Sequence, residues 1–90
     1  MEWKLFADLA EVAGERHVEV DAGTDATVAA ALDALLAARP ALRARVLDDD
    51  GDLHEHVNVL RNGVNLDRDL GDVAVEEGDE LALLPPVSGG

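Results

Sequence analysis

The feature that most restricts the fold of this 90-residue chain is a single strong helical pattern. Apolar residues recur at the spacing of one helix face at four positions: Val28, Leu32, Leu35 and Leu36. Thr27 just before them is a candidate N-cap. Pro40 disfavours helical geometry in the residue before it, so the helix is expected to run to about Arg39. One such helix can cover one face of a sheet, which leaves the other face open.

Segments before and just after this helix have shorter patterns. Residues 3–7 and 16–21 alternate apolar with polar side chains and are expected to form an antiparallel hairpin. Their connection, 8–14, is long for a turn and carries apolar residues, which favours a short helical turn within it. After Pro40, a short second helix is expected over 41–47, followed by an exposed acidic turn over 48–52.

Two further strands are expected towards the C-terminus. Residues 57–61 form a strand pattern that ends at Asn62-Gly63, the strongest short-range turn signal in the chain. Residues 80–84 form the last strand pattern, after a turn at 76–79. The predicted order of the main elements is therefore β, β, α, β, β.

This order predicts an α+β domain of the β-grasp type. In that architecture the last strand lies beside the first in a mixed sheet, and one main helix packs on one face. We expect the domain to span 1–84 and a flexible tail to span 85–90, since the length allows one domain only. A ferredoxin-like arrangement is the competitor. It needs a strong second helix after Gly63, and Val64 to Val75 is too rich in Asp, Asn and Gly.

Charge restricts the classes of partner. The formal net charge is −13, which repels phosphate backbones and anionic lipid, so neither nucleic acid nor a membrane is expected as a partner. No apolar run approaches the roughly 20 residues of a membrane span, and a cytoplasmic location is expected. The dominance of Asp and the near absence of Lys resemble proteins of salt-accumulating haloarchaea.

Catalytic and metal sites are not indicated. The chain has no cysteine, and no serine, histidine and acid are spaced so as to single out a triad, so Ser88 is interpreted as a tail residue. His54 and His56 flank an acid beside the aspartate run. If Gly51 were the sixth residue of a calcium loop, however, the first and last ligand positions would be Val46 and Val57, whose side chains carry no oxygen. The run therefore does not match a calcium loop. We expect no metal, no bound cofactor and no enzyme active site.

The C-terminal segment is where chemistry is expected. Two prolines at 85 and 86 stiffen the exit from the last strand, and the chain then ends in Gly89-Gly90. Glycines lack a Cβ, so Gly89 can thread through a narrow channel of another protein. The carboxylate of Gly90 would be the reactive group. Because an ionised carboxylate is a poor electrophile, a separate ATP-using enzyme is implied.

Two segments resemble a known family. Phe6-Ala7-Asp8-Leu9-Ala10-Glu11-Val12-Ala13-Gly14 and the terminal run from Gly78 through Leu84 to Gly90 are similar to the small, sulfur-carrying subunit of molybdopterin synthase. The small archaeal ubiquitin-like modifier proteins of haloarchaea resemble the chain more closely, because they share its acidic composition and the segment Asn58-Val59-Leu60-Arg61-Asn62-Gly63.

The resemblance implies a ubiquitin-like β-grasp whose Gly90 is adenylated by a ubiquitin-activating-type enzyme using ATP. The acyl adenylate would then have two fates. Sulfur transfer would give a thiocarboxylate. This group would donate sulfur for the synthesis of molybdopterin, with the large subunit of molybdopterin synthase as partner, and for tRNA thiolation. Attack by a substrate lysine would instead give an isopeptide bond. The alternative, from another class, is a β-grasp interaction module with an inert tail.

Strand parity predicts a partner surface. Trp3 and Leu5 would face the core, while Phe6, Leu60 and Leu84 would form an apolar patch on the open face, near the exit of the tail. A register slip would instead place these three residues in the core. Lys4, the only lysine, shares the parity of Phe6 and is a candidate isopeptide acceptor, with an ordinary surface lysine as the alternative.

Overall fold

The sheet has five strands, and its order sets the architecture of the molecule. In the computed structural model, which describes residues 1–90 except 24, 55–56, 67–69, 77 and 86–90, the order is β2-β1-β5-β3-β4. The strands are β1 (Glu2–Leu5), β2 (His17–Glu19), β3 (Asn58–Arg61), β4 (Val64–Leu66) and β5 (Glu80–Leu84). Only the β1–β5 pair is parallel, with Leu5 opposite Leu83. The mixed sheet with the last strand beside the first confirms the predicted β-grasp.

The helices are α1 (Asp8–Ala13), α2 (Val28–Ala38) and α3 (Arg43–Val46), with 3-10 turns η1 (Pro40–Leu42) and η2 (Leu70–Asp72). Thr27 caps α2 as predicted, because its hydroxyl accepts a hydrogen bond from the amide of Ala30 at 3.2 Å. The helix ends before Arg39, which has non-helical angles and precedes Pro40. None of the described helices is long and apolar enough to cross a membrane.

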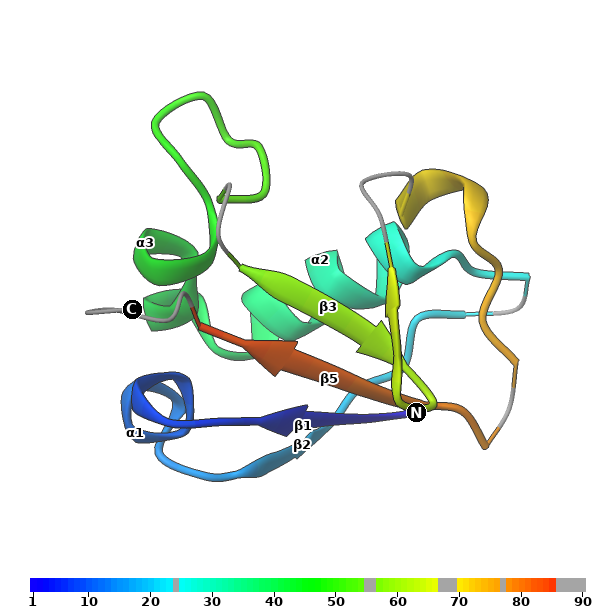
Figure 1. Cartoon of the computed structure of the whole chain (residues 1–90), viewed down its shortest axis with the longest axis horizontal. Coiled ribbons are helices and arrows are strands. Elements are labelled where there is room, and N and C mark those ends of the chain that lie inside the picture. The colour runs from blue at the N-terminus through cyan, green and yellow to red at the C-terminus, as the bar shows by residue number, and fades with distance from the viewer. Residues whose placement is uncertain (24, 55–56, 67–69, 77, 86–90) are drawn as a thin grey trace.

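The core lies between α2 and one face of the sheet, and in Figure 1 β3 passes in front of α2. Trp3 and Leu5 of β1 are fully buried there, together with Leu81 and Leu83 of β5. The indole Nε1 of Trp3 donates a hydrogen bond to the carbonyl of Ala31 at 3.0 Å. This bond pairs the one polar atom of a buried indole and fixes the helix against the sheet.

One feature of the C-terminal half differs from the prediction. The strand β4 was not predicted, because its three residues include Asn65 and none is buried, so no alternation marks it. It forms because Asn62 and Gly63 both adopt positive φ, 51° and 84°, which turns the chain back on itself. Among its described residues, the segment from Val64 to Val75 holds β4 and the short turn η2 and no longer helix, as expected for a β-grasp rather than a ferredoxin-like fold.

Candidate functional site

On the open face of the sheet, polar and apolar side chains from neighbouring strands form one row across the strands. Its members lie opposite one another in register, from β2 to β4: His17, Lys4, Ala82, Leu60 and Asn65. Ala82 is buried although it lies on the face away from α2, while Lys4 and Leu60 beside it are half-buried. This face is therefore partly apolar at its centre.

Phe6, Leu60 and Leu84 lie at one end of this face, and we call them the open-face patch. Leu84 is a diagonal neighbour of Leu60, because Leu60 pairs with Ala82 and β3 runs antiparallel to β5. Phe6 follows Leu5, which pairs with Leu83, so Phe6 is level with Leu84. Phe6 is 37% exposed, and Leu60 and Leu84 are half-buried. The structure thus brings the three predicted residues together outside the core; their role in docking stays a prediction.

The backbone at Ala7 positions Phe6. Ala7 has φ 52° and ψ −130°, in the positive-φ region that favours glycine. The chain turns sharply there from β1 into α1, and the carbonyl of Phe6 accepts a hydrogen bond from the amide of Leu9 at 3.1 Å. Ala7, with its positive φ, therefore directly follows Phe6, the most exposed member of the open-face patch. Nothing in the sequence signals it, because alanine is not a turn residue.

Lys4 lies beside the patch. Its Nζ is 5.6 Å from the centroid of the Phe6 ring, within the range of a cation–π contact. Among the ion pairs of the described residues none involves Lys4, although the chain has twenty acidic residues. The ammonium group is therefore associated with the patch rather than with a carboxylate.

The end of β5 faces the same edge of the molecule as the patch. In Figure 1 the C-terminal end of β5 lies at the edge that also holds α1 and α3, opposite the N-terminus. An ion pair between Arg45 and Asp8 at 2.8 Å links the two helices at this edge. Residues 86–90 lie outside the described residues, so the threading role of Gly89 and the reactive role of Gly90 stay predictions.

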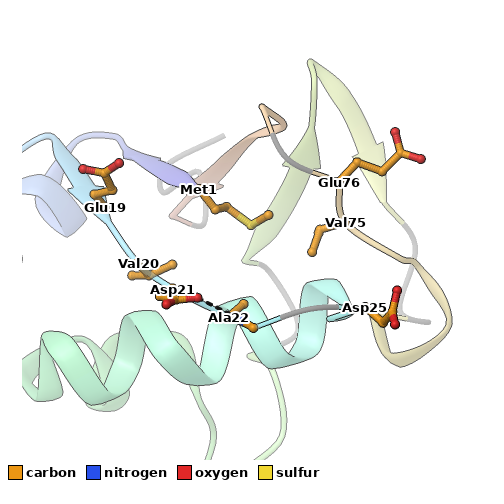
Figure 2. A pocket seen from close by; sticks show the side chains of 9 residues that line it. Met1, Glu19, Val20, Asp21, Ala22, Asp25, Val75 and Glu76 are labelled. Carbon is orange, nitrogen blue, oxygen red and sulfur yellow. Dashed lines mark hydrogen bonds between the residues drawn. The ribbon is translucent and has the colours of Figure 1, made fainter.

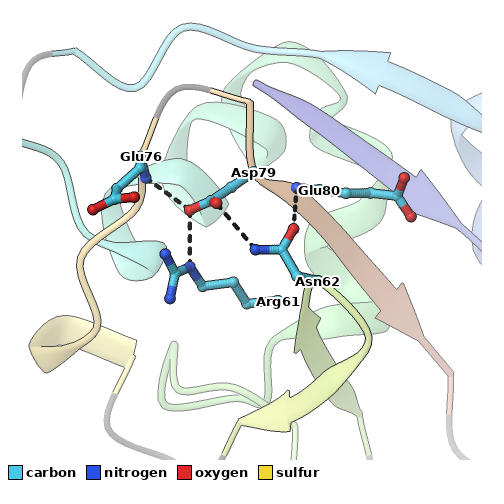
Figure 3. A network of polar contacts seen from close by, with 5 residues as sticks. All are labelled: Arg61, Asn62, Glu76, Asp79 and Glu80. Carbon is cyan, nitrogen blue, oxygen red and sulfur yellow. Dashed lines mark hydrogen bonds and ion pairs between the residues drawn. The ribbon is translucent and has the colours of Figure 1, made fainter.

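A polar network joins the β3–β4 turn to the start of β5, and Figure 3 shows its five residues. One oxygen of Asp79 accepts hydrogen bonds from the Glu76 amide at 2.7 Å and from Arg61 Nε at 2.8 Å. The other accepts from Asn62 Nδ2 at 3.0 Å. These three bonds, that of the Glu76 amide first, lower the pKa of Asp79 to about 2. Sequence reasoning found both turns but not this connection, because the partners are 17 or 18 residues apart in all but one bond.

A pocket opens at the edge opposite the tail exit, beside Met1 (Figure 2). Its lining combines the apolar side chains of Val20, Ala22 and Val75 with carboxylates, and none of the described residues that line it is a lysine or arginine. The carboxylates come from four residues: Glu19, Asp21, Asp25 and Glu76. Such a lining is unfavourable for a nucleotide phosphate.

The aspartate-rich turn forms local hydrogen bonds. Oδ1 of Asp48 accepts from the amides of Asp50 and Asp52 at 2.9 and 3.0 Å, which closes the turn. Among the described residues no group of three or more His, Asp or Glu is arranged to hold a metal ion. His56, which the sequence pairs with His54 beside the aspartate run, lies outside the described residues.

Comparison with known proteins gives a consistent result over the whole chain. The model of the ThiS family matches residues 3–90. Small archaeal modifier protein 1 of Haloferax volcanii is 66% identical over 90 residues, covering 100% of both chains.

Solved structures agree with the sequence relatives. The crystal structure of SAMP1 from Haloferax volcanii superposes with a TM-score of 0.92 at 66% identity, covering 100% of this chain and 98% of that chain. A chain in the crystal structure of the Amycolatopsis orientalis BexX/CysO complex superposes with a TM-score of 0.79 at 29% identity. The match covers 99% of this chain and 98% of that chain.

Proposed function

This chain belongs to the ThiS family, and from that membership we propose that it is a ubiquitin-like carrier and modifier activated at Gly90. The observation that carries the proposal is the position of the open-face patch at the edge where β5 ends. An activating enzyme that docks on Phe6, Leu60 and Leu84 would receive the residues after Leu84 without any change in the sheet. The occupant we assign to the patch is therefore that enzyme.

The chemistry of the proposal resides in a single carboxyl group. The Gly90 carboxylate attacks the α-phosphorus of ATP, pyrophosphate leaves, and a glycyl adenylate forms. This mixed anhydride is electrophilic, as the free carboxylate is not. The protein would supply the docking surface and the reacting group, and the separate enzyme would supply ATP and the catalytic residues.

Two acceptors would complete the reaction. Hydrosulfide, or another donor of sulfur at the oxidation level of sulfide, would attack the carbonyl carbon, displace AMP and leave a thiocarboxylate, which the large subunit of molybdopterin synthase would use. A substrate lysine would also displace AMP and form an isopeptide bond. The relative named as a modifier protein supports the lysine branch. The structural relative CysO, which forms a complex with a second protein, BexX, supports a carrier that acts together with a separate protein.

The test is direct. We would incubate the full chain with ATP and a haloarchaeal ubiquitin-activating-type enzyme and read the C-terminus by intact mass spectrometry. We expect an adenylate, a thiocarboxylate or a lysine adduct at Gly90. Deletion of Gly89-Gly90 should abolish every adduct while the circular dichroism spectrum is unchanged, because the last described strand, β5, ends at Leu84. An unmodified Gly90 with a demonstrably active enzyme would support the inert-tail module instead.

The same assay tests the patch with a matched pair of variants. Phe6 and Val64 are the large apolar side chains exposed among the described residues, but Val64 lies on the edge strand β4, away from the patch. Phe6→Ala should raise the KM for the carrier by about tenfold, the effect of losing an aromatic anchor worth about 1.4 kcal/mol. Val64→Ala should leave the KM unchanged. Equal effects of the two substitutions would remove the patch from the proposal.

A further inference from the structure

Lys4 occupies a position at which its own modification would interfere with docking. Its side chain is half-buried on the open face, and its Nζ lies 5.6 Å from the ring centroid of Phe6, a member of the open-face patch. Its strand neighbour Ala82 pairs in turn with Leu60, a second member of the patch. A partner seated on the patch would therefore cover Lys4.

We propose that Lys4 is an isopeptide acceptor whose conjugation switches the open-face patch off, and that docking on the patch in turn protects Lys4. The inference rests on the proposed function. The acyl donor we assign is the activated C-terminus of a second copy of this chain. Activation of one copy produces the electrophile, and any copy that is not docked on the enzyme exposes Lys4 as the nucleophile.

The bond-forming step is complete without further reagents. The unprotonated Nζ attacks the carbonyl carbon of the Gly90 adenylate, the bond from that carbon to the phosphate oxygen breaks, and AMP leaves with the electron pair. One proton passes from the nitrogen to solvent. The ammonium cation is replaced by a neutral amide, so the cation–π contact with Phe6 is also lost.

Length explains why the attached copy would occlude the patch. A six-residue tail, 85–90, can span at most about 20 Å when fully extended. The domain itself measures 37 × 25 × 25 Å. A domain of this size, tethered so closely to Lys4, has to remain over or beside the open face, where the enzyme would otherwise dock.

A footprinting experiment tests the protection. The full chain would be treated with an acetylating reagent, with and without the activating enzyme, and the rates at Lys4 and at the Met1 amino group compared by peptide mass spectrometry. Each amine is compared with itself in the absence of the enzyme, so a difference in their intrinsic reactivity cancels, and Met1 lies at the opposite edge, beside the pocket. We expect the enzyme to slow Lys4 acetylation at least tenfold and to leave Met1 unchanged. Equal protection of both amines, or of neither, would overturn the proposal.

A second measurement tests the switch. A carrier–carrier conjugate with the acceptor copy labelled by nitrogen-15 would be incubated with enzyme and ATP, and the adenylated C-terminus identified by mass. We expect the acceptor copy to be activated at least tenfold more slowly than the free, unconjugated chain. An acceptor activated at the rate of the free chain would overturn the switch alone, whereas a free chain that is never activated would overturn the proposed function.

Lys4→Arg supplies the control for the linkage. Arginine keeps a cation above the Phe6 ring but does not form an isopeptide bond under these conditions. We expect carrier–carrier conjugates to be absent from this variant, and fragmentation of the wild-type conjugate to place the bond at Lys4. Conjugates that persist in Lys4→Arg, linked through the amino group of Met1, would contradict the assignment.

Discussion

Ala7 shows how one residue can be unfavourable for the fold and still set the position of a neighbour. Its positive φ brings its Cβ into a steric conflict that glycine does not have, at a cost of about 1–3 kcal/mol. It also stands at the N-cap of α1 without a side-chain hydrogen bond. In return, the backbone of Ala7 sets the direction in which the chain leaves β1, and Phe6 is thereby held on the surface at the edge of the patch.

Ala7→Gly should therefore stabilise the protein. Relief of the strain, less the entropy that glycine loses on folding, leaves a gain of about 1 kcal/mol in the free energy of unfolding. Thermal unfolding should move up by about 4–8 °C in a domain of this size. Ala10→Gly, in the ordinary helical part of α1, is the control and should lose about 0.5–1 kcal/mol. Loss of stability in both variants would show that Ala7 carries no strain.

At the scale of elements, Asp79 joins two turns that are distant in sequence. It links the turn before β5 to the β3–β4 hairpin through Arg61 and Asn62, and its side chain is only 9% exposed. All three of its bonds favour the ionised carboxylate. Because its pKa is about 2 in the folded protein and about 3.9 in an unfolded chain, ionised Asp79 stabilises the fold above about pH 4. This contribution is lost as the pH falls from about 4 to 2.

The comparison of Asp79→Asn with the wild type should reproduce that pH window. Urea unfolding at pH 6 should show the variant to be less stable, and the difference should shrink steadily below pH 4 and nearly vanish at pH 2. Asp49→Asn removes the same charge from the exposed turn at 48–52 and serves as the control. A stability difference between Asp79→Asn and the wild type that is constant from pH 6 to 2 would rule out the ionic contribution of Asp79.

The elements could be predicted to different degrees, for physical reasons. The hairpin, α2 and the last strand follow from periodicity, from Thr27 and from Pro40, because these signals are local. The strand β4 is held by the turn before it and by β3, so its own residues carry no pattern. Parity separated Trp3 and Leu5 from Phe6 correctly, but the strained Ala7 and the network around Asp79 depend on tertiary geometry that no local pattern encodes.

Across the whole molecule, the net charge of −13 opposes the compact state. The repulsion is visible within the sheet, where Glu2 lies directly opposite Glu19 on one side and Glu80 on the other. Like charges placed directly opposite each other destabilise a sheet. Screening by salt shortens the range of the repulsion from about 10 Å at 0.1 M to about 3 Å at 1 M.

Stability should therefore fall when salt is removed. Between molar salt and dilute buffer we expect a loss of at least about 1 kcal/mol, which lowers the melting temperature by about 4–8 °C. Glu2→Gln, at the centre of the glutamate row, should reduce this salt dependence more than Asp33→Asn, an exposed acid on α2. A melting temperature that is the same in both buffers would contradict the argument.

β5 is synthesised last among the strands and yet lies in the middle of the sheet, between β1 and β3. Until the ribosome has released residues 80–84, the hairpins on either side have no strand to join them. Because Phe6, Leu60 and Leu84 come from three different regions of the chain, the patch exists only once β5 has paired with β1 and β3. An activating enzyme that binds this patch, as proposed, would not recognise nascent or broken chains, so folding would precede any use of ATP.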